Sequence, residues 1–483
     1  MRLSEEEFKR LGYRAVDIAA SYLAELPKGP VFQRMNDNQR EAVMNMPMPF
    51  APLSGDEILR LVAQQILPHP MGNGHPRFFG WVNSPPAMMA VVTEILAAAM
   101  NPSCAGGDHA AIYLEHLVAR WLMELLGFPI EGSAGLLVSG GSAASLTALA
   151  AARHRTLRQL GIDVRKQGVC VSHARLRVYA STQAHSCIQK AVELLGLGSE
   201  CIRWVGVDED FRVSLDGLRD AIREDRQQGW HPFCIVANAG SVHSGAIDPL
   251  DDLASMASEL GLWLHVDGAY GAAGILDPES EALFAGMERA DSIALDPHKW
   301  LSVPVECGCV LVRDGQLLRD AFSLVPPYIR TEPGKGIGNL PWFSEYGFQQ
   351  TRGFRALKLW VTLAHAGRSA LKQQVARQIA LARYLERRIE ATPEFELRSR
   401  GKLSIVCFRY LPPKLAGNEE ALDALNKEIM ERLQAEGIVF LTNTTLARRF
   451  VLRACILHYG TTEEDIDTML RALQEVSMRV MTK

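Results

Sequence analysis

The stretch Ala290-Asp-Ser-Ile-Ala-Leu-Asp-Pro-His-Lys-Trp300 contains a short apolar run that ends in three polar side chains, Asp296, His298 and Lys299. The run has the length of a buried strand, so we expect a strand over Ser292–Leu295. A lone lysine after a strand is usually a solvated surface charge. A lysine in this position could also form a Schiff base with a carbonyl group. The surrounding sequence decides between these two interpretations.

Outward from this stretch, short apolar runs alternate with helical stretches from about Ala87 to Arg313. Such alternation predicts βαβ units, and hence an α/β fold with a mainly parallel sheet covered by helices on both faces. Ligands bind such sheets at the carboxyl ends of the strands. The other expected strands are Gly135–Val138, Val169–Ser172, Arg177–Ala180, Cys201–Val205, Phe233–Asn238, Leu262–Asp267 and Cys309–Val312. The expected helices include Ala143–Arg153, Ser186–Leu195, Ser214–Gln227 and Pro249–Leu260.

The whole chain is expected to form three domains. Residues 1–86 form an N-terminal arm, with an amphipathic helix over residues 4–26 and a shorter helix at Gly55–Leu67. Residues 87–370 form a large domain and residues 371–483 a small C-terminal α+β domain. A long helix from Phe354 towards Glu390, with a break near Gly367, joins the two. The small domain is expected to contain strands at Leu403–Tyr410, Val439–Thr442 and Phe450–Leu457, and helices at Ala421–Glu436 and Glu463–Thr482.

Composition limits the classes of function. The chain has 483 residues, of which 48% are apolar and 22% charged, and its net charge is −4. This is the composition of a globular protein, and the charge favours neither nucleic acid nor an anionic membrane surface. The nine cysteines include no CxxC pair, so we expect reduced thiols rather than a zinc site or disulfides. The N-terminal segment has no apolar signal core, and we expect a cytoplasmic protein.

Three further motifs carry special residues at expected strand ends. In Leu136-Leu-Val-Ser-Gly-Gly-Ser-Ala-Ala-Ser145, small residues join a strand to a helix, so Gly141 and Ser142 could cradle a phosphate at the helix N-terminus. Asp267 ends an apolar strand, where a cationic nitrogen of a ligand could balance its charge. His185 lies between a strand and a helix. Taken singly, each is better explained by a structural role, as a tight turn, a backbone-bound acid or a capping histidine.

The set is more informative than its members. A phosphate cradle, a histidine that could cover a ring, a strand-end aspartate and a strand-end lysine follow one another along the chain. Pyridoxal 5'-phosphate (PLP) requires these four functions, because it needs an anion site, a ring cover, a partner for its pyridinium nitrogen and a Schiff-base lysine. The combination of Gly141, His185, Asp267 and Lys299 therefore indicates PLP as the cofactor.

Seven segments match, in order, one known family: HPRFFGW (His75–Trp81), SGGSAASLTALAAAR (Ser139–Arg153), STQAHSCIQKA (Ser181–Ala191), LHVDGAYG (Leu264–Gly271), DPHKWL (Asp296–Leu301), RGFRALKLW (Arg352–Trp360) and LRACILHYGTTEEDI (Leu452–Ile466). The chain resembles the group II PLP-dependent amino-acid decarboxylases, whose members include the aromatic-L-amino-acid decarboxylases. HVDxAY followed by PHKW is highly specific for them. The resemblance implies the type I PLP-dependent fold, with a seven-stranded sheet, and a homodimer with active sites at the interface and the N-terminal arm packed across it.

The resemblance also implies roles for individual residues. Lys299 is similar to the Schiff-base lysine, Asp267 to the partner of the pyridinium nitrogen, and His185 to the imidazole stacked on the cofactor ring. A carboxylate at the nitrogen keeps it protonated and makes the ring a better electron sink. The remaining matches are the phosphate-binding positions Gly141, Ser142 and Ser241, the ring-packing position Ala269, and His298 near the phosphate or substrate.

The chain departs from the family at several of these positions. Asp296 stands where many relatives have Asn, and Gly268 where they have Ala. The stretch Cys104–Gly107 lacks the aromatic side chain that aromatic-specific relatives place near the cofactor. These departures leave the identity of the amino-acid substrate open.

A larger departure lies in the family's mobile catalytic loop, here roughly Pro326–Gly347. Counting back without gaps from Arg355, the catalytic tyrosine of the family, which returns a proton to the product, falls on Phe343. Relatives with phenylalanine there react with oxygen and release an aldehyde. Tyr346 and Tyr328 lie nearby, and a small shift of the loop could supply the hydroxyl from either.

These features are compatible with three functions. The first is a decarboxylase that makes an amine and CO₂ from an aromatic or similar L-amino acid. The second is an aldehyde synthase that consumes oxygen and yields ammonia and hydrogen peroxide. The third is a non-catalytic PLP-binding protein, which the presence of Lys299, Asp267 and His185 together makes the weakest. An aminotransferase would share the fold but not the PHKW context.

Overall fold

The computed structural model describes residues 2–170, 175–324 and 342–482. The chain forms two compact units. One contains Met1–Pro85, Leu381–Arg398 and Ile405–Lys483, and the other contains Pro86–Ala380 and Ser399–Ser404. The N-terminal segment therefore belongs to the same unit as the C-terminal sheet. In the part of the chain that the structure describes, no helix combines the length and the apolar character that crossing a membrane would require.

The larger unit is built on a seven-stranded sheet in the order β1-β7-β6-β5-β4-β2-β3. Only β7 runs against its neighbours β1 and β6, while the other pairs are parallel. All strands except β7 therefore end at the same edge of the sheet. The strands are β1 Ala134–Val138, β2 Arg175–Ser181, β3 Ile202–Val205, β4 Trp230–Asn238, β5 Trp263–Asp267, β6 Ser292–Leu295 and β7 Gly308–Val312. The mainly parallel seven-stranded sheet expected from the sequence is confirmed.

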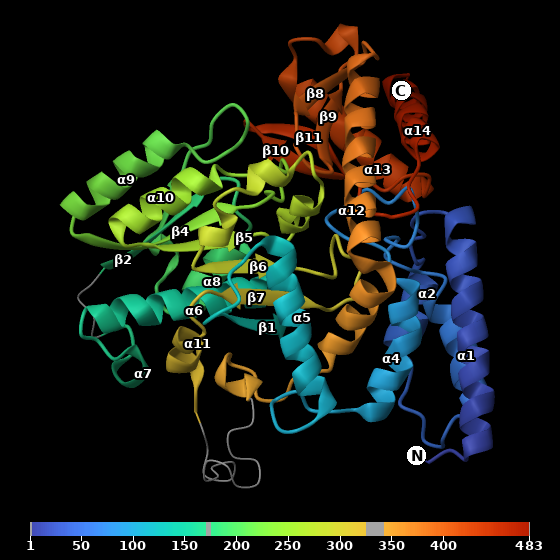
Figure 1. Cartoon of the computed structure of the whole chain (residues 1–483). Coiled ribbons are helices and arrows are strands. Elements are labelled where there is room, and N and C mark those ends of the chain that lie inside the picture. The colour runs from blue at the N-terminus through green and yellow to red at the C-terminus, as the bar shows by residue number, and fades with distance from the viewer. Residues whose placement is uncertain (1, 171–174, 325–341, 483) are drawn as a thin grey trace. The chain divides into compact units, whose positions relative to one another are not determined.

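Helices cover both faces of this sheet (Figure 1). Helix α6, Gly141–Gln159, lies along one face with α8, Cys187–Leu194, and α9, Leu215–Gln227, lies with α10, Leu250–Leu260, along the other. Four alanines of α6 are buried in the core between helix and sheet, and their small side chains allow a close approach. The unit also contains α4 Met88–Met100, α5 Ala110–Leu126, α7 Val164–Gln167 and α11 Gly315–Phe322.

The smaller unit carries a four-stranded sheet in the order β10-β11-β9-β8. Its apolar face packs against helices α13 and α14, and Leu425, Ile429, Leu433, Leu470 and Leu473 of these helices are buried in its core. The strands are β8 Phe395–Ser399, β9 Ile405–Tyr410, β10 Thr442–Leu446 and β11 Arg449–Cys455, and the helices α1 Glu5–Glu25, α2 Asp37–Met44, α3 Gly55–Leu61, α13 Glu419–Glu436 and α14 Glu463–Met481. Helix α12, Arg355–Glu390, joins the two units and is interrupted at Gly367, as expected.

Two of the expected strands are wrong in detail. The strand expected at Val439–Thr442 begins only at Thr442, because Phe440 pairs with Phe78 of the N-terminal segment in an isolated bridge. Of the strand expected at Val169–Ser172, the first two residues lie in a turn, and the last two lie outside the described residues. Strand β8, with the polar sequence FELRS, was not expected at all.

Candidate active site

The sheet brings the expected site residues to one edge. Gly141 follows β1, His185 follows β2, Ser241 follows β4, Asp267 ends β5 and Lys299 follows β6. These five strands run in one direction, so their carboxyl ends meet at the same edge. This is where open α/β sheets bind ligands.

Lys299 forms an ion pair with Asp296, three residues before it. The Lys299 ammonium lies 2.9 Å from Asp296 Oδ2, and His298 Nε2 lies 3.8 Å from the same oxygen. Burial by itself lowers the pKa of Lys299, but the charge and hydrogen bond of Asp296, together with the charges of Asp267 and Cys187, raise the net pKa. The other oxygen of Asp296, Oδ1, is buried and has no hydrogen-bond partner among the described residues. Asp296 is therefore a central member of the site.

Asp267 is buried at the end of β5. The backbone N–H of Ala269 donates to Asp267 Oδ1 at 3.1 Å, and the Cys187 sulfur lies 4.0 Å from Oδ2. A buried carboxylate with only one strong donor is stabilised further by a cation brought to it. A protonated ring nitrogen of a ligand would supply that cation.

The turn after β1 leaves the N-terminus of α6 open. Ser142 is exposed in the first turn of the helix, where free N–H groups attract an anion. A methyl group added at Gly141 would come within 2.9 Å of Ala269 Cβ and 3.1 Å of Asp296 Oδ2. A larger residue would therefore fill the cradle, which explains why glycine stands there.

His185 and Ser241 complete the set of expected residues. The N–H of Cys187 donates to His185 Nδ1 at 3.1 Å, which leaves the exposed Nε2 side of the ring free to face a ligand. The surrounding protein lowers the pKa of His185 through lost hydration, although Asp267 opposes this. Ser241 is buried, and its hydroxyl lies 2.9 Å from that of Ser244 in the turn after β4.

The loop residues lie in a different environment. The Phe343 ring is 2% exposed and packs in the core, with its centroid 4.5 Å from that of His116. The guanidinium of Arg352 lies 5.1 Å from the same ring. Tyr346 is half-buried beside it, at 6.3 Å between ring centroids. Tyr328 lies outside the described residues. Among the ring contacts of the described residues, none joins Phe343 to His185.

Behind β1, a buried ion pair holds the strand that leads to the cradle. Arg352 donates to Glu115 Oε2 at 3.1 Å and to the carbonyl of Cys104 at 2.9 Å, while the N–H of Leu137 donates to Glu115 Oε1 at 3.0 Å. Both charged side chains are 1% exposed. Removal of one partner would leave a buried charge unpaired, which strongly destabilises a protein.

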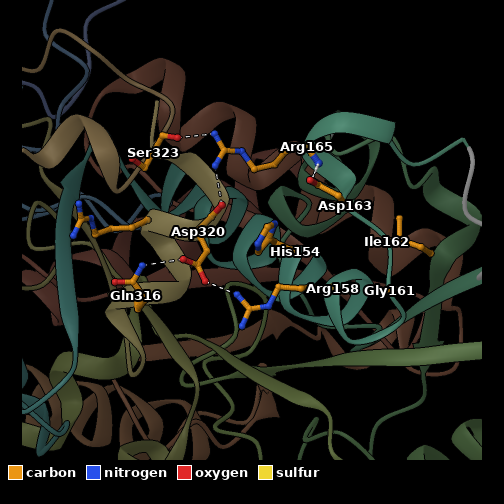
Figure 2. A pocket seen from close by; sticks show the side chains of 10 residues that line it. His154, Arg158, Gly161, Ile162, Asp163, Arg165, Gln316, Asp320 and Ser323 are labelled. Carbon is orange, nitrogen blue, oxygen red and sulfur yellow. Dashed lines mark hydrogen bonds and ion pairs between the residues drawn. The ribbon is translucent and has the colours of Figure 1, made fainter. Parts of the chain in front are cut away.

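A second hollow of about 750 Å³ lies between α6, α7 and α11, away from these residues (Figure 2). Its arginines are already paired: Arg158 lies 2.6 Å from Asp320, and Arg165 donates to the carbonyls of Asp320 and Ser323. Arg319 is paired with Glu345. A charged ligand would have to break these pairs, so we assign no site to this hollow.

The residues at the carboxyl edge fit PLP. They offer a lysine, a buried carboxylate, an imidazole and an open helix N-terminus bounded by glycine. Sequence reasoning noted Asp296 as a departure but did not count it as a site residue. Its position three residues before Lys299, in a turn after a strand, is the signal that could have identified it.

Comparisons with known proteins agree with this fit. The model of the pyridoxal-dependent decarboxylase conserved domain matches residues 38–411. An aromatic-L-amino-acid decarboxylase of Bacillus atrophaeus is 33% identical, over 99% of this chain and 97% of the relative. The crystal structure of Oryza sativa TDC with PLP and tryptamine has a TM-score of 0.92 at 27% identity, covering 100% of this chain and 99% of that one. That of Rhodiola rosea 4-hydroxyphenylacetaldehyde synthase has a TM-score of 0.87 at 26% identity, covering 99% of each chain.

These matches extend over the arm, the large sheet and the C-terminal sheet alike. The fold is the type I PLP-dependent fold expected from the sequence, and the cofactor is PLP. The chain belongs to the pyridoxal-dependent decarboxylases, and it is a PLP-dependent carboxy-lyase that acts on an amino acid.

Proposed function

We propose that the chain decarboxylates an aromatic L-amino acid to the corresponding amine and CO₂, as a cytoplasmic homodimer. The observation that carries the reaction is the meeting of Lys299, Asp267 and the Gly141 cradle at one edge of the sheet. The aromatic class of substrate is supported by the names of the relatives in Bacillus atrophaeus and Oryza sativa.

Each residue has a separate task in this proposal. Lys299 would hold the cofactor through its amine. Asp267 holds a proton on the ring nitrogen, and His185 covers one face of the ring. Gly141, Ser142 and Ser241 hold the phosphate. When bound, the cofactor supplies an electron sink that stabilises the charge left on the α-carbon by the departing CO₂.

The aldehyde synthase remains the second candidate. Its support is the match to the Rhodiola rosea enzyme and the position of Phe343 in the ungapped count. The burial of Phe343 against His116 and Arg352 weighs against it, because a packed core ring is poorly placed to face a substrate. Tyr346, half-buried, and Tyr328 are the alternative proton donors.

The experiment follows amine, CO₂, oxygen and peroxide together while the PLP-loaded protein is incubated with tryptophan, tyrosine, phenylalanine and, as a non-aromatic control, glutamate. We expect equal amounts of amine and CO₂ from an aromatic substrate, with no oxygen uptake. Peroxide in step with CO₂ would favour the aldehyde synthase. Turnover of glutamate alone would overturn the aromatic assignment.

Lys299→Ala tests the cofactor site directly. We expect loss of turnover and loss of the protein–cofactor adduct that borohydride traps, because the amine of Lys299 is the group that would form this adduct. Lys190→Ala, which changes an exposed lysine of α8, is the control and should leave both intact. An adduct that persists in Lys299→Ala would show that the lysine is misassigned.

The homodimer rests on the resemblance and on exposed apolar side chains. Helix α4 exposes Met88, Val92 and Leu96, and α1 exposes Phe8 and Tyr13. Apolar groups of this number are typical of surfaces that a partner covers. Light scattering on the eluting protein should give a mass near twice 53.3 kDa, and a fully active monomer would contradict the proposal.

A further inference from the structure

We propose that a one-directional chain of hydrogen bonds starts at the Trp263 indole, runs through Ser292, His265 and Ser145, and orients donors towards Asp267. These four are positioning residues, since they act on the cofactor through Asp267. The inference rests on the proposed role of Asp267 and deepens it.

The chain is buried and its links are short. Trp263 Nε1 donates to Ser292 Oγ at 2.8 Å, and Ser292 Oγ lies 2.9 Å from His265 Nδ1. On the other side of the ring, His265 Nε2 lies 3.1 Å from Ser145 Oγ. All four side chains are 0–1% exposed. They join β5, β6 and α6, whose ends bound the site.

The indole fixes the direction of the chain. An indole N–H can only donate, so Ser292 Oγ accepts from Trp263. The hydroxyl proton of Ser292 then needs an acceptor, and His265 Nδ1 is the remaining partner of this oxygen among the described residues. A buried hydroxyl without an acceptor is strongly unfavourable. His265 Nδ1 therefore accepts, and the ring proton sits on Nε2.

His265 continues the chain of hydrogen bonds in the same direction, towards Ser145 of α6. Burial lowers the pKa of His265 to about 4, although Asp267 raises it, so the ring is neutral at physiological pH. A neutral imidazole that accepts at Nδ1 donates at Nε2. Ser145 Oγ therefore accepts a hydrogen bond from His265, and the hydroxyl proton of Ser145 is left to be donated to a further acceptor.

The next group is the Cys187 thiol. Ser145 lies close enough to Cys187 to lower the pKa of its thiol, and the Cys187 sulfur lies 4.0 Å from Asp267 Oδ2. Burial raises the pKa of Cys187 to about 12, so the sulfur carries a proton that it can donate weakly to the carboxylate. Every link thus presents a donor in the direction of Asp267, and none presents a lone pair that would repel its charge.

His265 and Asp267 stand two residues apart on β5, so they share one face of the sheet. This spacing, together with Ser145 on the facing helix, lets the chain reach the carboxylate from behind while its front remains available to a ring nitrogen. A weakened chain should lower the basicity of the ring nitrogen, because the carboxylate of Asp267 would be oriented less well towards it.

The test compares three breaks in the chain with a matched control. Trp263→Phe removes the first donor, Ser292→Ala removes the relay to the ring, and Ser145→Ala removes the relay to Cys187. Thr147→Val is the control, since its buried hydroxyl on the same helix donates only to the carbonyl of Ala143. Circular dichroism and thermal melting identify variants that fail to fold, and any one folded variant of the three suffices.

The readout is the protonation of the ring nitrogen in the holoenzyme, followed with ¹⁵N-labelled PLP by NMR from pH 6 to 9, together with the dissociation constant of PLP. In the parent and in Thr147→Val, the nitrogen should stay protonated over the range. In the three chain variants, it should lose its proton towards the upper end, and PLP should bind about three- to ten-fold more weakly, as expected for one hydrogen bond.

Two failures can be told apart. Asp267→Asn is measured alongside, and a protonated nitrogen with unchanged PLP binding in that variant would overturn the role of Asp267 itself. A deprotonated nitrogen in Asp267→Asn combined with parent-like behaviour of the chain variants would overturn the chain alone. ¹⁵N-histidine spectra, assigned by loss of one signal in His265→Gln, provide a second check, since a proton on Nδ1 of His265 would reverse the deduced direction.

Discussion

Among single residues, Asp296 has the most direct effect on the chemistry of the site. Its carboxylate lies 2.9 Å from Lys299 and raises the pKa of that amine. Only a neutral amine attacks the carbonyl of the cofactor. The parent should therefore take up PLP covalently at a higher pH than a variant without this charge.

We predict that Asp296→Asn shifts the pH profile of PLP uptake to lower pH. The measurement is the rate at which the visible absorption band grows after PLP is added to the apoprotein, across a pH series. Glu306→Gln, whose carboxylate pairs with Arg355 instead, is the control and should keep the parent profile. A shift of Asp296→Asn to higher pH would exclude this role.

For Phe343, the core position leads to a stability prediction. The ring packs against His116 and is 2% exposed, so a hydroxyl added to it is buried. An unsatisfied buried hydroxyl costs about 1–3 kcal/mol. Phe343→Tyr should therefore lower the urea midpoint and leave the ratio of amine to peroxide unchanged, while Tyr346→Phe or Tyr328→Phe should raise peroxide if that residue donates the proton. A Phe343→Tyr variant with parent stability and altered products would restore Phe343 to the site.

Sequence reasoning about the site succeeded where a residue stands at a strand end. Lys299, Asp267 and His185 could be placed because the carboxyl ends of parallel strands meet at one edge. His265 could not be assigned, because its partners depend on the register that sets it opposite Ser292. The register describes how two strands are aligned with each other, so it cannot be predicted from the sequence of either strand alone.

At the scale of helices and strands, the break in α12 is the clearest agreement between sequence and structure. Gly367 has φ 70° and ψ 161°, a conformation that side chains with a Cβ atom rarely adopt. A sequence with helical periodicity on both sides of a glycine predicts such an interruption.

Gly367→Ala should lower the free energy of unfolding by about 1–3 kcal/mol, because alanine is strained at this φ even though no atom crowds the site. Gly353→Ala is the matched control, since that glycine also has open space around it but no positive φ. Urea unfolding of the two variants measures the difference. Equal stability would mean that the helix can straighten at Gly367.

The strands that were misjudged have two different physical reasons. Phe440 pairs with Phe78, a residue far away in the chain, and such long-range pairing overrides local propensity. Strand β8 has half-buried polar residues at its centre. Its sequence therefore contains neither the apolar run nor the clear alternation that would predict a strand. Strands of the large sheet, which are buried on both faces, were easier because their apolar runs are continuous.

For the whole molecule, buried histidines predict sensitivity to acid. Burial lowers the pKa of His75, His265 and His458 to about 4, from an ordinary value of 6.5. Between these values the unfolded chain binds more protons than the folded one, so stability should fall as the pH falls from about 6.5 to 4. Buried Asp248, whose pKa is raised to about 6, and Asp291, whose pKa burial also raises, act in the opposite direction.

The free energy of unfolding, measured with urea between pH 7.5 and 4.5, should decrease through this window. His458→Gln removes one titrating ring and should make the decrease shallower, whereas His365→Gln, at an exposed histidine, should not change its slope. A stability that is constant or rises towards pH 4.5 would contradict the prediction.

The order of strands in the large sheet has a consequence for synthesis on the ribosome. Strand β1 is the first strand of this sheet to be translated, yet its partner is β7, the last. At about 5–20 residues per second, β1 waits on the order of ten seconds or longer for Gly308–Val312 to emerge. During that interval its apolar edge is a template for pairing with other chains. Truncations before Val312 lack the strand that covers this edge and should therefore aggregate.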